Sequence, residues 1–569
     1  MTQTKPCGPK DADAGTSRNP LKPGPTAAGH QRDLPALVVV IAVLAVSLRL
    51  GLAVATQYTQ EDFLITLRYA ENIAQGHGFV YNSGERILGT TTPLYALLLA
   101  GADWLGLPAP IVGKALNILA DGGLCLVVYR VLAWVKQENA GVCVAFLVAV
   151  NPIQMRVAIS GQESSLAALC GASVWLLFLQ RRYIVAYVAG AVLFLLRWDG
   201  LLLVAVLTLA ILVRERRLPV RALLAFGLAC APWLVFASWY FGSPIPVTLA
   251  AKTVVYGWYF GSERFPELPR LLFRLGGTPL YAALTIAAVG AWRLCREHRW
   301  AFAPPVAWFA LYWIAFLSSR VWLFEWYLVP PLFVYEMLAG LGLATLAERL
   351  GILRQCPLRC AAPLALAGLV GFLNVRDTLS YTRGLQGLED HLRRPLGRWL
   401  RAHSRPTDRI MLEPIGYIGY YSRLPVVDMI GLVTPSMLPC YDRKNACPWL
   451  LIADAYRPEW CILRPSEVAP MQRASQAAGR PWEKYYRHIK SFSYAAPSDK
   501  SPTVFEVCQR RSQPTVPARP RLFLEQAPHR PAKAFATTGA REAVGSGGSG
   551  SNASGSQNSV RQFEAQFPA

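Results

Sequence analysis

The feature that most constrains this chain is its series of apolar runs, because about twenty apolar residues in a row can cross a bilayer as one helix. The first run covers residues 34–55, and ten more follow between residues 112 and 375. Across 569 residues, 53% are hydrophobic and only 16% are charged, which is more apolar surface than one soluble core can hold. The sequence therefore predicts an α-helical polytopic membrane protein with about eleven transmembrane helices.

The basic residues predict the direction in which the helices cross. Residues 1–33 are rich in Pro, Gly and Lys and are expected to form a disordered cytoplasmic tail. The first run lacks a signal-peptide cleavage site and is expected to remain as an anchor. Five basic loops then fall on the cytoplasmic side, near residues 130–136, 181–182, 214–217, 293–299 and 349–359. The net charge of +22 is thus assigned to topology, and no nucleic-acid partner is expected, because no nucleic-acid-binding motif occurs.

The predicted transmembrane domain covers residues 34–375 and includes a first outer loop at residues 57–111. Residues 61–74 have helical spacing of apolar side chains, which predicts a helix on the membrane surface. Residues 93–107 are too short to span comfortably and contain Asp103, so a second surface helix is expected. Counting this segment as a span would invert every later loop.

An odd number of spans places the rest of the chain outside. Residues 376–511 have the composition of a small α/β domain, with an amphipathic helix at 391–403 and strands at 409–412, 425–430, 460–463 and 504–508. Residues 512–569 are rich in Pro, Arg, Gly and Ser and are expected to form a flexible tail. The domain contains four cysteines, which allow three pairings; Cys440 and Cys447 close a short loop and are the favoured pair.

Charged residues that interrupt the apolar runs share one side of the predicted membrane. On this topology they all fall at or beyond the outer ends of spans, which favours one outward-facing polar cavity over independent loop charges. Carboxylates can remove a proton from a hydroxyl or hold a divalent cation, and Lys or Arg can bind a phosphate. Transfer of a sugar from a polyprenyl phosphate needs both functions. The residues are Glu61, Asp62, Glu163, Arg197, Asp199, Lys252, Arg320 and Glu325.

Several motifs along the chain, taken in order, resemble those of the membrane-embedded GT-C glycosyltransferases. The similarity is greatest to the bacterial branch that includes terminal arabinofuranosyltransferases. The motifs are Glu61-Asp62, GHGFVYNSGER at 76–86, LGTTTPLY at 88–95, SGQE at 160–163, RWDG at 197–200, FGSPIP at 241–246 with Ala251-Lys252, FEWY at 324–327 and GYIGYY at 416–421 with Val427-Asp428.

The resemblance implies a multi-span core, a juxtamembrane first loop, a soluble C-terminal domain and inverting transfer from a polyprenyl-phosphate sugar. It makes Asp62 the general base, with Glu61 beside it where many relatives have a second aspartate. Glu61 and Glu163 would position the acceptor or hold a divalent cation such as Mg²⁺, Mn²⁺ or Ca²⁺. Arg197, Lys252 and Arg320 are candidate phosphate binders. Further candidates for substrate binding are Arg68, His77, Asp199, Glu325 and Tyr327.

The leading hypothesis is therefore a glycosyltransferase in a bacterial inner membrane, with a cytoplasmic N-terminus and a periplasmic C-terminal domain. The favoured sugar is arabinofuranose or another pentose, and the acceptor is a cell-envelope glycan, lipid or protein. Two other classes stay open. A transporter or flippase of lipid-linked saccharides would also need a polar cavity in the membrane, although no repeated halves are evident. A non-catalytic envelope scaffold would leave the clustered carboxylates without a role.

Overall fold

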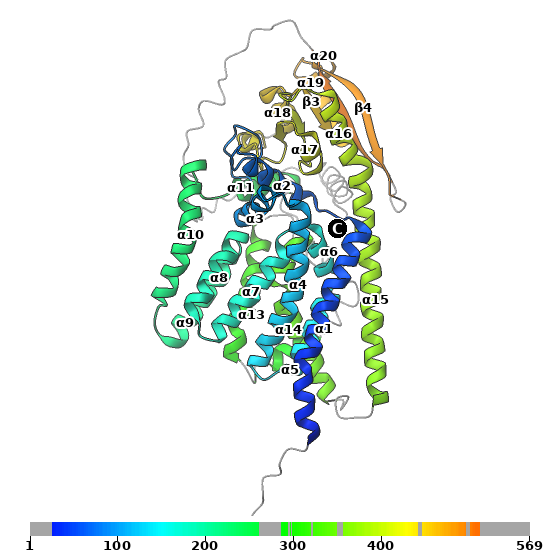
Figure 1. Ribbon diagram of the computed structural model, residues 1–569. Helices are drawn as coiled ribbons and strands as arrows, with labels where there is room; N and C mark the ends of the chain where they lie inside the picture. The colour runs from blue at the N-terminus through cyan, green and yellow to red at the C-terminus, as the bar shows by residue number, and fades with distance from the viewer. Residues whose placement is uncertain are drawn as a thin grey trace, which may run out of the picture.

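The computed structural model describes residues 25–260, 286–293, 296, 299–319, 323–349, 357–441, 447–496 and 501–511. Figure 1 shows a bundle of helices capped at one end by a smaller α/β domain, with α15 rising along the bundle and leading into that domain. The predicted fold class, a helical polytopic membrane protein with a C-terminal α/β domain, is confirmed.

Five described helices are long and apolar enough to cross a membrane. They are α1 (Pro25–Thr56, apolar from Leu34), α4 (Ala109–Trp134), α10 (Val220–Phe241), α13 (Arg299–Ser318, apolar from Trp300) and α14 (Val329–Arg349). The shorter apolar helices α7 (Ser164–Leu179) and α8 (Tyr183–Leu196) pack among them, with α9 (Gly200–Glu215) beside α8. The total of eleven spans stays a prediction.

One predicted span is broken in the structure. Residues 139–156 form two helices, α5 (Glu138–Val150) and α6 (Pro152–Ser160), which meet at an angle of 55°. The break follows from local chemistry: Pro152 cannot continue the hydrogen bonding of α5, and the Asn151 side chain accepts hydrogen bonds from the backbone N–H groups of Ile153 and Gln154. Together α5 and α6 pass the test for a sixth span.

The two helices expected in the first outer loop are present as α2 (Glu61–Ala74) and α3 (Pro93–Trp104), and they pack against each other. Helix α11 (Val247–Phe260) lies on the same side of the bundle as this loop (Figure 1). A backbone hydrogen bond of 3.0 Å from Val247 to the Leu88 carbonyl links α11 to the loop.

The boundary predicted at residue 376 lies inside a continuous helix, α15 (Pro357–Leu388), which leads through one wider helical turn, η3 (Glu389–Arg393), into α16 (Arg394–His403). The predicted apolar face of this segment is correct, because Leu392, Leu396 and Leu400 are completely buried. Burial of each such side chain contributes about 2 kcal/mol. The C-terminal domain is therefore attached to the bundle by a helix rather than by a flexible linker.

The domain contains a five-stranded sheet in the order β2-β1-β3-β5-β4. Strand β1 (Ile410–Leu412) pairs in parallel with β2 (Val426–Asp428) and β3 (Trp460–Leu463), whereas β5 (Thr503–Arg510) is antiparallel to β3 and to β4 (Tyr486–Tyr494). The sequence predicted four of these strands and missed β4. This edge strand is mostly exposed and lacks the alternation of buried and exposed residues that marks a strand. Short helices α17 (Tyr417–Ser422), α18 (Pro448–Tyr456), α19 (Pro465–Ala477) and α20 (Trp482–Tyr485) and the turn η4 (Pro435–Cys440) complete the domain.

The cysteines of the domain do not form the favoured disulfide. Within the described residues, no bond joins Cys440 to Cys447. Cys461 and Cys508 stand opposite each other in the register of β3 and β5, and both are buried thiols.

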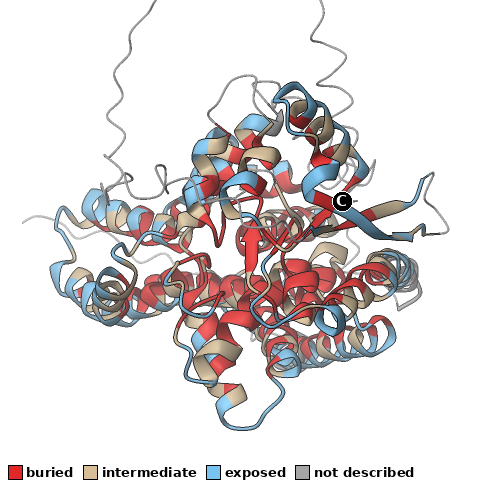
Figure 2. Ribbon diagram, turned by 90° about the horizontal axis from the view of Figure 1, so that it is seen from above, coloured by how far each residue is buried: buried red, intermediate tan, exposed pale blue. Residues whose placement is uncertain are grey.

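The first outer loop and the C-terminal domain form a continuous interface. The Arg68 guanidinium donates to the carbonyl oxygens of Tyr81, Gly419 and Leu424, at 2.7–2.9 Å. The Asn82 amide bonds both backbone groups of Val426. Seen from above, buried residues concentrate toward the centre of the molecule and exposed residues lie around its edge (Figure 2). This interface sets the position of the residues described next.

Candidate functional site

Two adjoining cavities lie around the N-terminus of α2, and Asp62, Gln162, Lys252 and Trp326 line both of them. The larger cavity reaches toward α15 and the C-terminal domain, and the smaller one toward the threonines of the LGTTTPLY motif. Six of the eight charged residues predicted to share a cavity line one or both, namely Glu61, Asp62, Glu163, Arg197, Lys252 and Glu325. Asp199 lines neither cavity but forms an ion pair with Arg197. Arg320 lies outside the described residues.

Asp62 lies in the first turn of α2 and keeps 34% of its side-chain surface exposed. Its Oδ2 atom is 3.8 Å from the Lys252 Nζ atom, and Lys252 also donates to the Tyr327 hydroxyl at 3.1 Å. Desolvation of the carboxyl group inside the protein raises the pKa of Asp62. The Lys252 charge lowers this pKa, and the Glu413 carboxylate raises it. Asp62 is thus a carboxyl group that faces open space next to a buried cation.

Glu61, the neighbour of Asp62, has a different environment. One carboxylate oxygen accepts hydrogen bonds from the backbone N–H groups of Gly416 and Tyr417, and the other is 3.5 Å from an Arg393 nitrogen. Burial raises the pKa of Glu61 to about 7, against the lowering effect of Arg393 and the two N–H groups. A Cβ atom at Gly416 would collide with the Glu61 backbone and carboxylate, which explains the glycine that begins GYIGYY. Glu61 therefore attaches the C-terminal domain to the start of α2.

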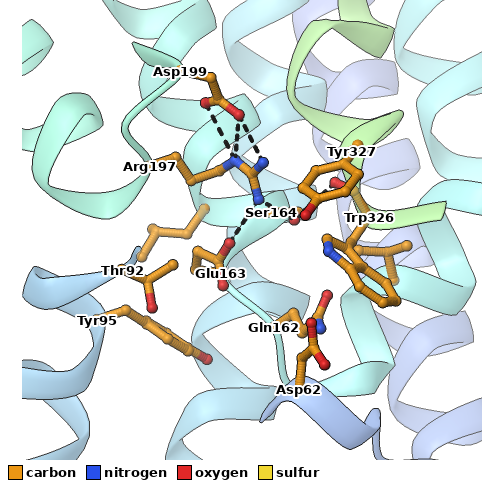
Figure 3. A network of polar contacts seen from close by, with 12 residues as sticks. Asp62, Thr92, Tyr95, Gln162, Glu163, Ser164, Arg197, Asp199, Trp326 and Tyr327 are labelled. Atoms are coloured by element: carbon orange, nitrogen blue, oxygen red, sulfur yellow. Dashed lines mark hydrogen bonds and ion pairs between the residues drawn. The ribbon is translucent and has the colours of Figure 1, made fainter. Parts of the chain in front are cut away.

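Glu163 and Arg197 form a buried ion pair in the smaller cavity. Arg197 donates to Glu163 at 2.8 Å and to Asp199 at 2.7 Å (Figure 3). Asp199 also accepts from the Tyr312 hydroxyl at 3.3 Å. Gly161 ends α6 with a φ of +93°, and this left-handed turn brings Gln162 and Glu163 to the cavities. Arg197 is thereby held between two carboxylates, whereas Lys252 donates to the Tyr327 hydroxyl and lies 3.8 Å from Asp62, which leaves an ammonium donor for a ligand.

Glu325 lines the larger cavity and is bound by Arg156, which donates two hydrogen bonds to it at 3.0 and 3.2 Å. Sequence reasoning missed Arg156, because it falls within a run that was assigned to one span. It also missed Glu389, Arg393, Glu413 and Asp428, which the C-terminal segment contributes to the same cavity. Only Asp428 carried a signal, through its place after the GYIGYY motif.

Two predicted substrate-binding residues lie away from both cavities. Arg68 is buried, and its guanidinium is used by three backbone carbonyl groups at the domain interface. His77 is exposed, 3.4 Å from the Asn72 side-chain oxygen. Arg68 thus has a structural position, and it was a candidate for binding only because it lies in the helical segment that follows Glu61-Asp62.

The two predicted metal ligands, Glu61 and Glu163, line different cavities. Among the described residues, no group of three or more His, Cys, Asp or Glu side chains is arranged to hold an ion. Glu61 lines the larger cavity next to Arg393, and Glu163 lines the smaller one next to Arg197. Each of these arginines also bonds a second carboxylate, Glu389 or Asp199. A divalent cation bound at these glutamates stays a prediction.

Comparison with known proteins places the fold. A family model described as a domain of unknown function, DUF8728, matches residues 381–513, and no curated protein matches the chain. The archaeal oligosaccharyltransferase AglB from Archaeoglobus fulgidus, solved with an inhibitory peptide and a dolichol phosphate, is similar over 84% of this chain and 74% of its own, with 13% identity and a TM-score of 0.53. ArnT from Cupriavidus metallidurans, solved with undecaprenyl phosphate, is similar over 84% of this chain and 98% of its own, with 12% identity and a TM-score of 0.52.

Proposed function

We propose that this chain, which has the fold of the GT-C membrane glycosyltransferases, transfers a sugar from a polyprenyl-phosphate donor to an acceptor hydroxyl, with inversion at the anomeric carbon. The observation that carries the proposal is the position of Asp62, a partly exposed carboxyl group where two cavities meet, 3.8 Å from the Lys252 ammonium.

The chemistry follows from these two side chains. Asp62 takes the proton of the acceptor hydroxyl as that oxygen bonds to the anomeric carbon. The bond between the anomeric carbon and the phosphate oxygen breaks, and its electron pair leaves with the prenyl phosphate. A phosphate is a weak base, so it leaves without an acid if a cation neutralises it. Lys252 is the cation placed to do so, while Arg197 positions Glu163 and the wall of the smaller cavity.

The resemblance in fold supports the donor class, because the structures of AglB and ArnT contain dolichol phosphate and undecaprenyl phosphate, respectively. Helices that are long and apolar enough to cross a membrane would place the protein in a bilayer, where the prenyl chain of a donor can also lie. Arabinofuranose or another pentose as the sugar, a cell-envelope acceptor and a periplasmic site in a bacterial inner membrane remain part of this proposal.

The test is sugar transfer by the purified protein in nanodiscs, with short-chain prenyl-phosphate pentoses and hexoses and a mixed glycan acceptor pool. Asp62→Asn should abolish transfer. Asp454→Asn, an exposed aspartate on α18 outside both cavities, is the matched control and should keep wild-type turnover.

Turnover by Asp62→Asn at the wild-type rate would refute the base assignment. Binding of donors without any transfer would favour the transporter hypothesis. Movement of the lipid-linked sugar across the membrane of sealed vesicles is then measured.

A further inference from the structure

The larger cavity has an excess of acidic side chains. Its described lining contains six carboxyl groups and three cations, and the cations Arg156, Lys252 and Arg393 each face an acid of the same lining. The acids are Glu61, Asp62, Glu325, Glu389, Glu413 and Asp428. Beyond the lining, Arg464 binds Glu413, but it also binds Glu467, so the acidic excess persists when bonded neighbours are included.

The carboxyl groups of this cavity act on one another. Burial raises the pKa of Glu389 to about 8, and the Glu61 charge adds to the effect. Burial likewise raises the pKa of Asp428 to about 6, with a further contribution from Glu413. At neutral pH Glu389 is mostly protonated, so an added anion would meet the desolvation of the cavity and the repulsion of those acids in the lining that are ionised. The cavity therefore disfavours a negatively charged ligand.

Three buried polar atoms of the same wall have no hydrogen-bond partner among the described residues. They are the Gln162 Oε1, Glu389 Oε2 and Arg393 Nε atoms, in residues that are 4%, 7% and 5% exposed. A buried polar atom without a partner costs about 1–3 kcal/mol, so these atoms point to a ligand that supplies hydrogen bonds. Two of the three are oxygens that can accept from hydroxyl groups, and the aromatic side chain of Trp326 lies in the same lining.

From this wall we infer that the larger cavity binds the acceptor and selects an uncharged polyhydroxyl glycan over an anionic one, with Glu389 and Gln162 accepting its hydroxyl groups. This inference rests on the proposed glycosyl transfer. Arg393 is a positioning residue, since its bond of 2.5 Å to Glu389 and its contact with Glu61 orient both acids.

The donor phosphate suits the smaller cavity better. Its described lining sets Asp62 and Glu163 against Arg197 and Lys252, so its acidic excess is smaller than that of the larger cavity even when Asp199, which bonds Arg197, is counted. The side chains of Thr90, Thr92 and Thr248 add hydroxyl groups to the same lining, and hydroxyl groups can donate to phosphate oxygens. The attacking hydroxyl and the leaving phosphate would then approach Asp62 and Lys252 from the two cavities that share them.

The experiment compares neutral hexose and pentose oligosaccharides with their uronate counterparts, by calorimetric binding and by transfer, on the full-length protein in nanodiscs. Neutral acceptors should bind and react better than the uronates by about tenfold or more, as repulsion worth about 1.4 kcal/mol would give. Glu389→Gln should raise the acceptor KM about three- to tenfold and leave the donor KM unchanged, because one hydrogen-bond acceptor is altered. Glu483→Gln, an exposed glutamate outside both cavities, should change neither.

The comparison of neutral and uronate glycans uses the wild-type protein, so it does not depend on the folding of any variant. Equal or better use of the uronates, or a Glu389→Gln variant with a changed donor KM and an unchanged acceptor KM, would overturn the acceptor assignment while transfer itself stands. If the wild-type protein transferred no sugar from any donor, the proposed function would be rejected instead. The binding data would still decide which glycan the cavity prefers.

Discussion

Two regions of the molecule bury opposite charges, and they differ in how completely those charges are bonded. Inside the bundle, Arg49 of α1 pairs with Asp121 of α4, and the same guanidinium donates to the carbonyl oxygens of Val148 and Ala149 at 2.8 and 2.9 Å. Asp121 also accepts from the Gln154 amide at 2.6 Å. At the end of the bundle next to the C-terminal domain, Lys252 and Asp62 are 3.8 Å apart, and Asp62 keeps open space beside it. A closely bonded pair holds helices together, whereas a loosely bonded one is available to substrates.

The largest expected effects come from the two aspartates of these regions. Asp62→Asn should lower kcat by about 10²–10⁴-fold, the range for removal of a general base, with little change in Tm. Asp121→Asn should lower the free energy of unfolding by about 3–5 kcal/mol, because it leaves Arg49 buried without its charge partner. Turnover and thermal unfolding are measured on both variants in the same detergent. Similar losses of Tm in both would remove the distinction between the two regions.

Lys252→Met should have the next largest effect on turnover. It removes the cation next to Asp62, so we expect kcat/KM for the donor to fall by about 10²-fold, as when one group that stabilises a developing charge is lost. Lys490→Met, on the exposed face of β4, is the control and should leave kcat/KM unchanged. An unaltered kcat/KM in Lys252→Met would mean that the phosphate binds elsewhere.

Glu61→Gln sharpens the comparison between adjacent residues. The amide oxygen can still accept from Gly416 and Tyr417, so turnover should fall less than about tenfold. Glu61→Ala removes these bonds and should also lower Tm, because the C-terminal domain loses an attachment to α2. A loss of turnover in Glu61→Gln equal to that of Asp62→Asn would show that the two carboxylates share the proton transfer.

The smallest expected effect is on the pH dependence of stability. The pKa values of Glu61 and Glu389 rise from an ordinary 4.5 to about 7 and about 8 in the folded protein, chiefly through burial. The folded state therefore holds more protons than the unfolded state over this interval, and stability falls as the pH rises from about 4.5 to 8. Glu389→Gln should flatten the slope of Tm against pH. An unchanged slope would place the titration elsewhere.

The sequence predicted that several charged residues share a site because, on the expected topology, they all fall at the same ends of the apolar runs. Glu61, Asp62, Glu163 and Lys252 are separated by up to 191 residues, yet they line adjoining cavities because helices that cross a membrane return their outer ends to one surface. The same reasoning could not see Arg393 or Glu389, which follow the last span and lie in a segment of ordinary polar composition. It also could not separate Arg68 from the binding residues, because a position on the helix after Glu61-Asp62 does not reveal that the guanidinium donates to three carbonyl groups.

The sequence by itself determined that the protein is a helical membrane protein with a C-terminal α/β domain, and that helices follow the acidic pair at the end of the first apolar run. It could do so because apolar length, periodicity and charge are local properties. Only the tertiary structure decided which acid of the pair is exposed and which is bonded to the C-terminal domain. The partners of Glu61 are Arg393, Gly416 and Tyr417, more than 330 residues away along the chain. A carboxylate becomes a base or an attachment point according to the groups that reach it, and folding brings those groups from anywhere in the chain.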